Sequence, residues 1–251
     1  MRTISMALVL LLALGCEARD SERGRFTVFA ASSLTEAFQD LADAFAENTG
    51  NPAPTLVFAG SQVLRLQIEQ GARADVFASA NLKHMRALAA SGHVATPEVF
   101  AYNELVVIVP RDNPASIREL SDLPRAHRLV IGAPEVPIGI YTRELLERME
   151  ALFGPDFAPA VQSRVVSEES NVRLVRAKVE LGEADAAIVY RTDASDAVET
   201  IEIPREISPQ ASYHIGLVRA APHPEIAERW IAFVESETGR AILQRRGFVT
   251  P

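Results

Sequence analysis

A short apolar strand followed by a helix recurs several times along the sequence, and this alternation limits the folds open to the chain. Residues 25–30, 55–59 and 74–78 have the composition of strands. Each is followed by a segment with apolar residues at helical spacing, and each of these segments ends at a glycine. The alternation resumes between residues 128 and 190. This pattern predicts α/β architecture with mainly parallel strands.

Two of the strand-to-helix joints carry serine. The first strand runs into Ser32 and Ser33, and the second runs into Ser61. Each serine, taken singly, is typical of a plain helix N-cap. A helix start also offers unpaired backbone N–H groups and the positive end of the helix dipole. Two such joints in one lobe would be able to hold a small anion without lysine or arginine.

Two long strands bracket the second half of the alternation. They cover residues 103–109 and 212–219, and the simplest topology makes them the hinge of a two-lobed molecule with a cleft between the lobes. We therefore expect lobe 1 to comprise residues 25–104 and 216–251, and lobe 2 to comprise residues 105–215. One continuous sheet is the alternative that this pattern leaves open.

The second lobe has its own helix starts after tight turns. Pro137 lies just before one helix, and Asn171, like the serine before it, is a natural N-cap of another. The backbone N–H groups near Ile138 and Val172 are then expected to be free donors at the carboxyl ends of strands, where ligands of open α/β sheets gather. Tyr190 ends a strand in the same half. The alternative is that Ile138 and Val172 only pack, and that the phenol of Tyr190 is bonded to protein.

The N-terminus has the composition of an export signal. Residues 1–15 contain Arg2 and a short apolar run, and Cys16 follows at once. This stretch resembles a bacterial lipoprotein signal, in which the cysteine is lipidated, although Ala13 stands where leucine is common. Residues 16–24 would then be a lipid-anchored tether. An ordinary exported protein with an incidental cysteine is the alternative.

Composition excludes several classes of function. The net charge is −8, and it becomes −9 without the predicted signal, so a nucleic-acid partner is not expected. An anion site in such a chain must work through short-range hydrogen bonds. Cys16 is the only cysteine, which leaves no thiol for disulfides, catalysis or a metal. The five histidines show no metal-ligand spacing, and Ser33 is not in a Gly-x-Ser-x-Gly motif, so an exported enzyme is disfavoured.

Seven stretches carry a family resemblance: VFAASSL (28–34), FAGS (58–61), QIEQGARADVFASA (67–80), NELVV (103–107), VPIGIY (136–141), NVR (171–173) and GEADAAIVY (182–190). Together and in this order, they resemble the molybdate-binding proteins of bacterial ABC importers. The resemblance covers nearly the whole chain after the signal. It implies the type II periplasmic-binding-protein fold, with two α/β lobes joined by two crossing strands.

The resemblance also implies a ligand and a site. A molybdate ion, or tungstate, would be held by the hydroxyls of Ser33 and Ser61, the backbone N–H groups of Ile138 and Val172, and the phenol of Tyr190. Molybdenum would be present only as the bound oxyanion, without a cofactor. The implied protein is a monomeric receptor outside the cytoplasm, anchored through Cys16, which delivers its ligand to an ABC permease.

Three positions depart from the pattern of the relatives. Ser32 adds a hydroxyl beside the site, Gly60 leaves one hydroxyl where a run of three is seen in some relatives, and Ile138 is bulkier than the usual alanine. These changes bear on pocket size and selectivity more than on the class of ligand. A receptor for sulfate or another small oxyanion therefore stays open as an alternative.

Overall fold

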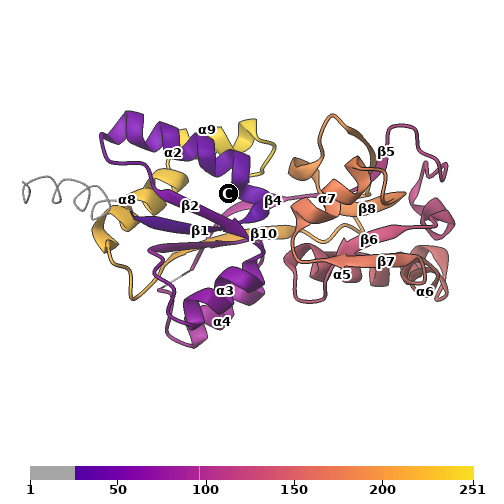
Figure 1. Cartoon of the computed structure of the whole chain (residues 1–251), viewed down its shortest axis with the longest axis horizontal. Coiled ribbons are helices and arrows are strands. Elements are labelled where there is room, and N and C mark those ends of the chain that lie inside the picture. Colours follow the sequence, from indigo (N-terminus) through magenta and orange to yellow (C-terminus); the bar gives the residue numbers. More distant parts are fainter. Residues whose placement is uncertain (1–25, 96) are drawn as a thin grey trace, which may run out of the picture.

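The computed structural model of the chain describes residues 26–95 and 97–251. The predicted signal, the tether and Cys16 lie outside the described residues. The described part forms two lobes, each built around one five-stranded sheet (Figure 1). The predicted two-lobed α/β architecture is confirmed, and the alternative of one continuous sheet is excluded.

The first lobe holds the strands that the sequence placed at its start, together with strands from later in the chain. Its sheet has the order β2 (Thr55–Ala59), β1 (Thr27–Ala31), β3 (Val76–Ser79), β10 (Ala211–Leu217) and β4 (Glu98–Asn103). One face is covered by α2 (Thr35–Thr49), α8 (Pro224–Glu235) and α9 (Glu237–Arg245), and the other by α3 (Ser61–Glu69) and α4 (Leu82–Ala90) (Figure 1). A short 3-10 turn, η1 (Ser32–Leu34), joins β1 to α2.

An aromatic cluster fills the core between the first sheet and its three-helix layer. Trp230 of α8 is fully buried, and its ring contacts those of Phe26, Phe38 and Phe45 at centroid distances of 5.5–6.1 Å. These rings are large apolar groups in edge-on or tilted contact, a geometry that aromatic pairs favour. The cluster fixes α2 and α8 on the sheet, and with them the start of α2 at the edge facing the second lobe.

The second lobe repeats the arrangement. Its sheet has the order β7 (Val165–Glu169), β6 (Leu129–Gly132), β8 (Ala186–Tyr190), β5 (Leu105–Pro110) and β9 (Val198–Glu202). The helical segments of this lobe are η2 (Leu120–Arg125), α5 (Pro137–Phe153), α6 (Phe157–Gln162), α7 (Val172–Glu180) and η3 (Arg191–Asp193). In both sheets the first three strands are parallel, and the fourth is antiparallel to its neighbours. Strands β1, β2 and β3 therefore correspond to β6, β7 and β8.

Two connections join the lobes. Strand β4 ends at Asn103 and β5 begins at Leu105, so only Glu104 separates a strand of one sheet from a strand of the other. The second connection is the irregular segment 203–210, which leads from β9 to β10. The predicted second crossing strand is thus replaced by this segment, because all of β10 is hydrogen-bonded within the first sheet. The expected boundary at residues 215/216 falls inside β10.

No helix in the described part of the chain combines the length and the apolar character that crossing a bilayer requires.

Candidate functional site

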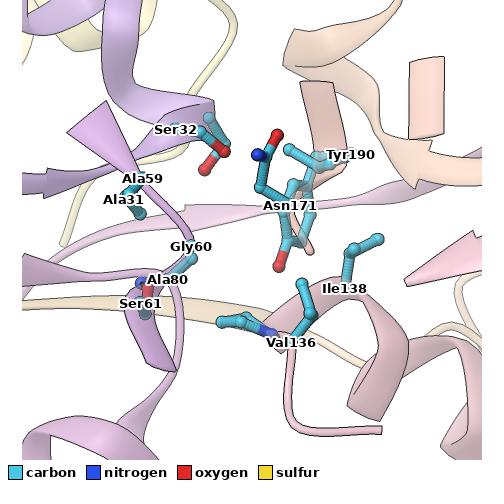
Figure 2. A pocket seen from close by; sticks show the side chains of 13 residues that line it. Ala31, Ser32, Ala59, Gly60, Ser61, Ala80, Val136, Ile138, Asn171 and Tyr190 are labelled. Atoms are coloured by element: carbon cyan, nitrogen blue, oxygen red, sulfur yellow. Dashed lines mark hydrogen bonds between the residues drawn. The ribbon is translucent and has the colours of Figure 1, made fainter. Parts of the chain in front are cut away.

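A small pocket lies between the two lobes, where the carboxyl ends of their parallel strands face each other (Figure 2). The space between its lining atoms is about 200 Å³, part of it open to solvent. Both lobes line it, with Ala31, Ser32, Ser33, Ala59, Gly60, Ser61 and Ala80 from the first and Val136, Pro137, Ile138, Asn171, Val172 and Tyr190 from the second. All six residues that the sequence predicted for the pocket are in this lining, so the fold brings them together.

The two serines of the first lobe do not cap helices. Ser33 lies within η1, and Ser61 is the first residue of α3 after the N-cap Gly60. Neither η1, α2 nor α3 has a side-chain cap hydrogen bond. The interpretation of Ser33 or Ser61 as a plain N-cap is therefore wrong. The third serine, Ser32, is also buried at the pocket wall.

Both hydroxyl oxygens instead accept hydrogen bonds from within the first lobe. The backbone N–H of Ala80 donates to Ser61 Oγ at 3.1 Å, and the phenol of Tyr213 donates to Ser33 Oγ at 3.0 Å. Ser61 is 1% exposed and Ser33 is 6% exposed. Because each oxygen already accepts a bond, the hydroxyl hydrogens of both serines remain for an acceptor in the pocket.

The second lobe presents helix N-termini. Pro137 is the first residue of α5, and Asn171 caps α7 by accepting a bond from the N–H of Leu174 at 3.1 Å. Within the described residues, the N–H groups of Ile138 and Val172 have no acceptor, as expected for the first turn of a helix. The side chains of both residues are buried and both residues line the pocket, so packing and an unpaired backbone donor occur together.

Two glycines bring the start of α5 against the end of β6. A Cβ on Gly139 would lie 2.2 Å from the carbonyl oxygen of Ala133, and one on Gly132 would lie 2.7 Å from the nitrogen of Gly139. Neither glycine is at a positive φ, so close backbone approach is what requires them. This contact determines where the N–H of Ile138 sits.

Tyr190 supplies a buried hydroxyl without a partner. Its side chain is 1% exposed, and Figure 2 shows it reaching from the second lobe into the space between the lobes. No hydrogen-bond partner for this hydroxyl exists among the described residues, which contradicts the alternative that it is bonded to protein. Burial raises the pKa of Tyr190 well above its usual range, so the phenol keeps its proton. A buried donor of this kind favours a ligand that supplies an acceptor.

The pocket has no charged side chain among its described lining residues. Arg173, one residue beyond Val172, is paired with Glu36 of the first lobe at 2.6 Å. A small anion would therefore meet hydroxyls, backbone N–H groups and the positive ends of α5 and α7 rather than a counter-charge. Nor do three His, Cys, Asp or Glu side chains gather as a metal site anywhere in the part of the chain that the structure describes.

The lobes touch each other around the pocket. Gln62 Nε2 donates to the carbonyl oxygen of Ser170 at 2.7 Å, beside Gly60. A Cβ on Gly60 would lie 2.4 Å from that same oxygen, so glycine permits this approach. Further contacts between the lobes are Arg173 with Glu36, Lys83 with Glu135 (3.2 Å), His84 Nε2 with the carbonyl oxygen of Glu135 (2.7 Å), and the N–H of Ser212 with Tyr141 Oη (3.2 Å). The structure thus shows the lobes closed over the pocket.

Sequence reasoning missed the residues that stand behind the serines. Asn103 and Tyr213 are buried and are linked by hydrogen bonds to each other and to Ser33. Asn103 opens one of the stretches that carry the family resemblance, so a signal was present. Tyr213 is 180 residues from Ser33 in sequence, and no local pattern joins the two.

Comparisons with known proteins agree with this architecture. The family model described as bacterial extracellular solute-binding protein matches residues 26–249. A molybdate-binding protein ModA of Mycobacterium tuberculosis is 36% identical over 231 residues, which is 89% of this chain and 84% of that protein. The ModA of Escherichia coli is 32% identical, covering 91% of this chain and 90% of the relative. A substrate-binding lipoprotein of Bacillus subtilis named YvgL, described as putative, is 28% identical, with coverages of 95% and 93%.

Among solved structures, the periplasmic molybdate-binding protein of Azotobacter vinelandii has a TM-score of 0.78 at 21% identity, covering 90% of this chain and 100% of that one. The sulfate-binding protein SubI of Mycobacterium tuberculosis has a TM-score of 0.76 at 17% identity, with coverages of 90% and 86%. At these identities the two structures show a shared fold. The family model that matches residues 26–249 and the relatives at 32–36% identity establish that the chain belongs to the family of bacterial extracellular solute-binding proteins, the family of its molybdate-binding relatives.

Proposed function

We propose that the chain is the receptor of a bacterial ABC importer and captures molybdate, and also tungstate, between its lobes. The observation that carries the proposal is the composition of the pocket: buried hydroxyls, unpaired helix N–H groups and no charged lining side chain among the described residues. The molybdate-binding relatives at 32–36% identity support the choice of ion.

The donors assigned to the ion are Ser33, Ser61, Ile138, Val172 and Tyr190, with Ser32 as an additional hydroxyl. These groups offer hydrogens, and a fully deprotonated tetrahedral oxyanion offers only acceptors. A dianion would be stabilised there by short, oriented hydrogen bonds. A ligand that carries a proton on one of its oxygens would place that hydrogen against a donor hydrogen of the pocket.

A panel of oxyanions tests the proposal. The purified protein is melted in the presence of molybdate, tungstate, sulfate and phosphate. A ligand present at about 100 times its Kd stabilises the protein by about 2.7 kcal/mol, which gives a clear rise in melting temperature. We expect this rise with molybdate and tungstate, and at most a small one with sulfate and phosphate. A larger shift with sulfate would make the protein a sulfate receptor, and no shift with any of the four would overturn the assignment.

The wider biological role follows from the same family. The receptor would act outside the cytoplasm as a monomer, without a cofactor and without catalysis, and would deliver its ion to an ABC permease in the cytoplasmic membrane. Its attachment would be through lipid on Cys16. Expression of the full chain in a bacterial host tests the anchor: the wild type is expected in the membrane fraction, and the Cys16→Ala variant is expected to be soluble. An equal distribution of the two would contradict lipidation.

A further inference from the structure

A chain of hydrogen bonds with a fixed direction ends at Ser33. It begins at Glu104, the single residue between β4 and β5, whose backbone N–H donates to Asn103 Oδ1 at 3.0 Å. Asn103 Nδ2 donates to Tyr213 Oη at 3.5 Å and to Thr192 Oγ1 at 2.8 Å. The phenol of Tyr213 then donates to Ser33 Oγ at 3.0 Å.

Each step of this chain has only one chemically consistent direction. A backbone N–H can only donate, so the amide of Asn103 must turn its oxygen toward Glu104 and its nitrogen toward Tyr213. The amide nitrogen can also only donate, so the oxygen of Tyr213 accepts from it. Ser33 Oγ is the acceptor that the described structure gives the single hydrogen of Tyr213. Ser33 Oγ accepts that hydrogen, and its own hydrogen is left for the pocket.

The parts of the chain are held in place by burial. Asn103 is 2% exposed and Tyr213 is fully buried. The Tyr213 ring packs edge-on against Phe248 at a centroid distance of 5.3 Å and against Tyr190 at 5.7 Å. Burial also raises the pKa of Tyr213 well above its usual range, so its phenol remains a donor.

We propose that Asn103 and Tyr213 are specificity-determining positioning residues, which fix the Ser33 hydroxyl as a donor and so favour fully deprotonated oxyanions. The inference rests on the proposed function. A ligand with a protonated oxygen at Ser33 would force the serine hydrogen away from the pocket and toward Tyr213, whose own hydrogen already points at Ser33 Oγ. A buried hydroxyl hydrogen left without an acceptor in this way costs binding free energy.

Replacing the amide nitrogen of Asn103 by an oxygen reverses the direction of this chain of hydrogen bonds. When the new carboxyl of Asn103→Asp is ionised, both of its oxygens can only accept: one keeps the Glu104 N–H, and the other takes the hydrogen of Tyr213. The phenol oxygen is then left to accept from Ser33, whose hydrogen turns out of the pocket. We expect the affinity for molybdate, measured by titration calorimetry, to fall about 10- to 100-fold. The preference for molybdate over inorganic phosphate, which keeps a proton near neutral pH, should narrow.

A double variant separates hydrogen-bond direction from charge. Asn103→Asp also adds a negative charge, which by itself repels a dianion. In Asn103→Asp/Tyr213→Phe the charge remains but the chain is cut, so Ser33 can turn back to the pocket. We expect the double variant to bind molybdate more tightly than Asn103→Asp alone. Equal affinity of the two variants would mean that charge alone acts, and would overturn the proposal.

Two further variants test the same proposal without Asn103→Asp. If Asn103→Asp does not fold, Tyr213→Phe alone is compared with Tyr102→Phe, which removes a phenol outside the chain. The former should lose about 3- to 10-fold in molybdate affinity and discriminate less against phosphate, and the latter should match the wild type. Unchanged discrimination in Tyr213→Phe would overturn the proposal. If the wild type itself binds no molybdate, the proposed function fails first, and the two failures are thus distinguished.

Discussion

The two lobes have the same sheet topology but present different kinds of donor. After β1 and β2 the first lobe offers serine hydroxyls, at Ser33 and Ser61. After the corresponding strands β6 and β7, the second lobe offers backbone N–H groups at Ile138 and Val172. One architecture thus supplies hydrogen-bond donors at matching places by two chemical routes.

The two kinds of donor are held in their orientations in different ways. The hydroxyls of the first lobe can rotate, and their orientation depends on partners in the same lobe, Tyr213 and Ala80. The N–H groups of the second lobe are fixed by the helix geometry itself. Side-chain substitutions can therefore remove the donors of the first lobe, whereas those of the second lobe respond only to changes in backbone position.

The largest effect is expected from removing both serine hydroxyls. A hydrogen bond to a charged group contributes about 1.5–3 kcal/mol, so Ser33→Ala and Ser61→Ala should each weaken molybdate binding by roughly 10- to 150-fold. The double variant should lose more than either single variant. Titration calorimetry measures the loss, and the melting temperature of the ligand-free protein serves as the control for folding. Wild-type affinity in both single variants would show that the first lobe is not the half of the site described here.

Tyr190→Phe should separate binding from stability. The phenol has no partner in the described structure, so its removal costs the ligand-free protein nothing and should leave its melting temperature unchanged or higher. Binding should still weaken by about 1.5–3 kcal/mol, because the bond to the ion is lost. The serine variants differ, since each leaves a donor, the Tyr213 phenol or the Ala80 N–H, without its acceptor. A fall in the ligand-free melting temperature of Tyr190→Phe would contradict the assignment of its hydroxyl to the ligand.

Gly60→Ala tests whether tight molybdate binding requires direct contact between the two lobes. Its Cβ would press on the Ser170 carbonyl of the other lobe, and overpacking of this kind costs about 1–3 kcal/mol. The same Cβ would lie 2.5 Å from the amide of Gln62 in its own lobe, but that side chain is flexible and can move aside once the lobes part. The clash with the Ser170 carbonyl exists only when the lobes meet, so the dissociation rate of molybdate should rise while the ligand-free protein melts nearly as before. Stopped-flow measurements of association and dissociation distinguish the two rates. A variant that loses affinity only through slower association would argue against a clash in the closed state.

The smallest effect is expected from Glu36→Gln. The carboxylate pairs with Arg173 across the lobes, but both side chains are about one-third to one-half exposed, at 45% and 32%. Exposed ion pairs contribute at most about 1 kcal/mol and are screened by salt. Molybdate affinity should therefore fall less than about fivefold at low salt, and the difference from the wild type should disappear at high salt. A loss that persists in high salt would give this pair a larger part in closure.

Local patterns predicted much of the fold and of the pocket lining. The strand–helix alternation located β1, β2 and β8, because their apolar runs are bounded by clear turn residues. Strands β4 and β9 and the short helix α6 were not predicted, and β9 shows why: it is largely exposed and lacks an apolar run. Placing Ser33 and Val172 in one pocket required only the general rule about the carboxyl ends of parallel strands.

The orientation of the donors could not be predicted in this way. A serine at the start of a helix is typical of a cap, and only the positions of Tyr213 and the Ala80 N–H show that these hydroxyls are engaged elsewhere. Tyr213 lies on β10, and Ala80 directly follows β3 of the same sheet. Their approach depends on the order of strands in space, which is not encoded in any single segment.

The single residue between β4 and β5 has a mechanical consequence. One residue of extended chain spans at most about 3.6 Å, so Glu104 acts as a short pivot. If the lobes of a solute receptor turn about it, this connection keeps them from sliding far apart. The two half-sites would then keep their register on opening, and the search for the closed arrangement would be a search over angles rather than over positions.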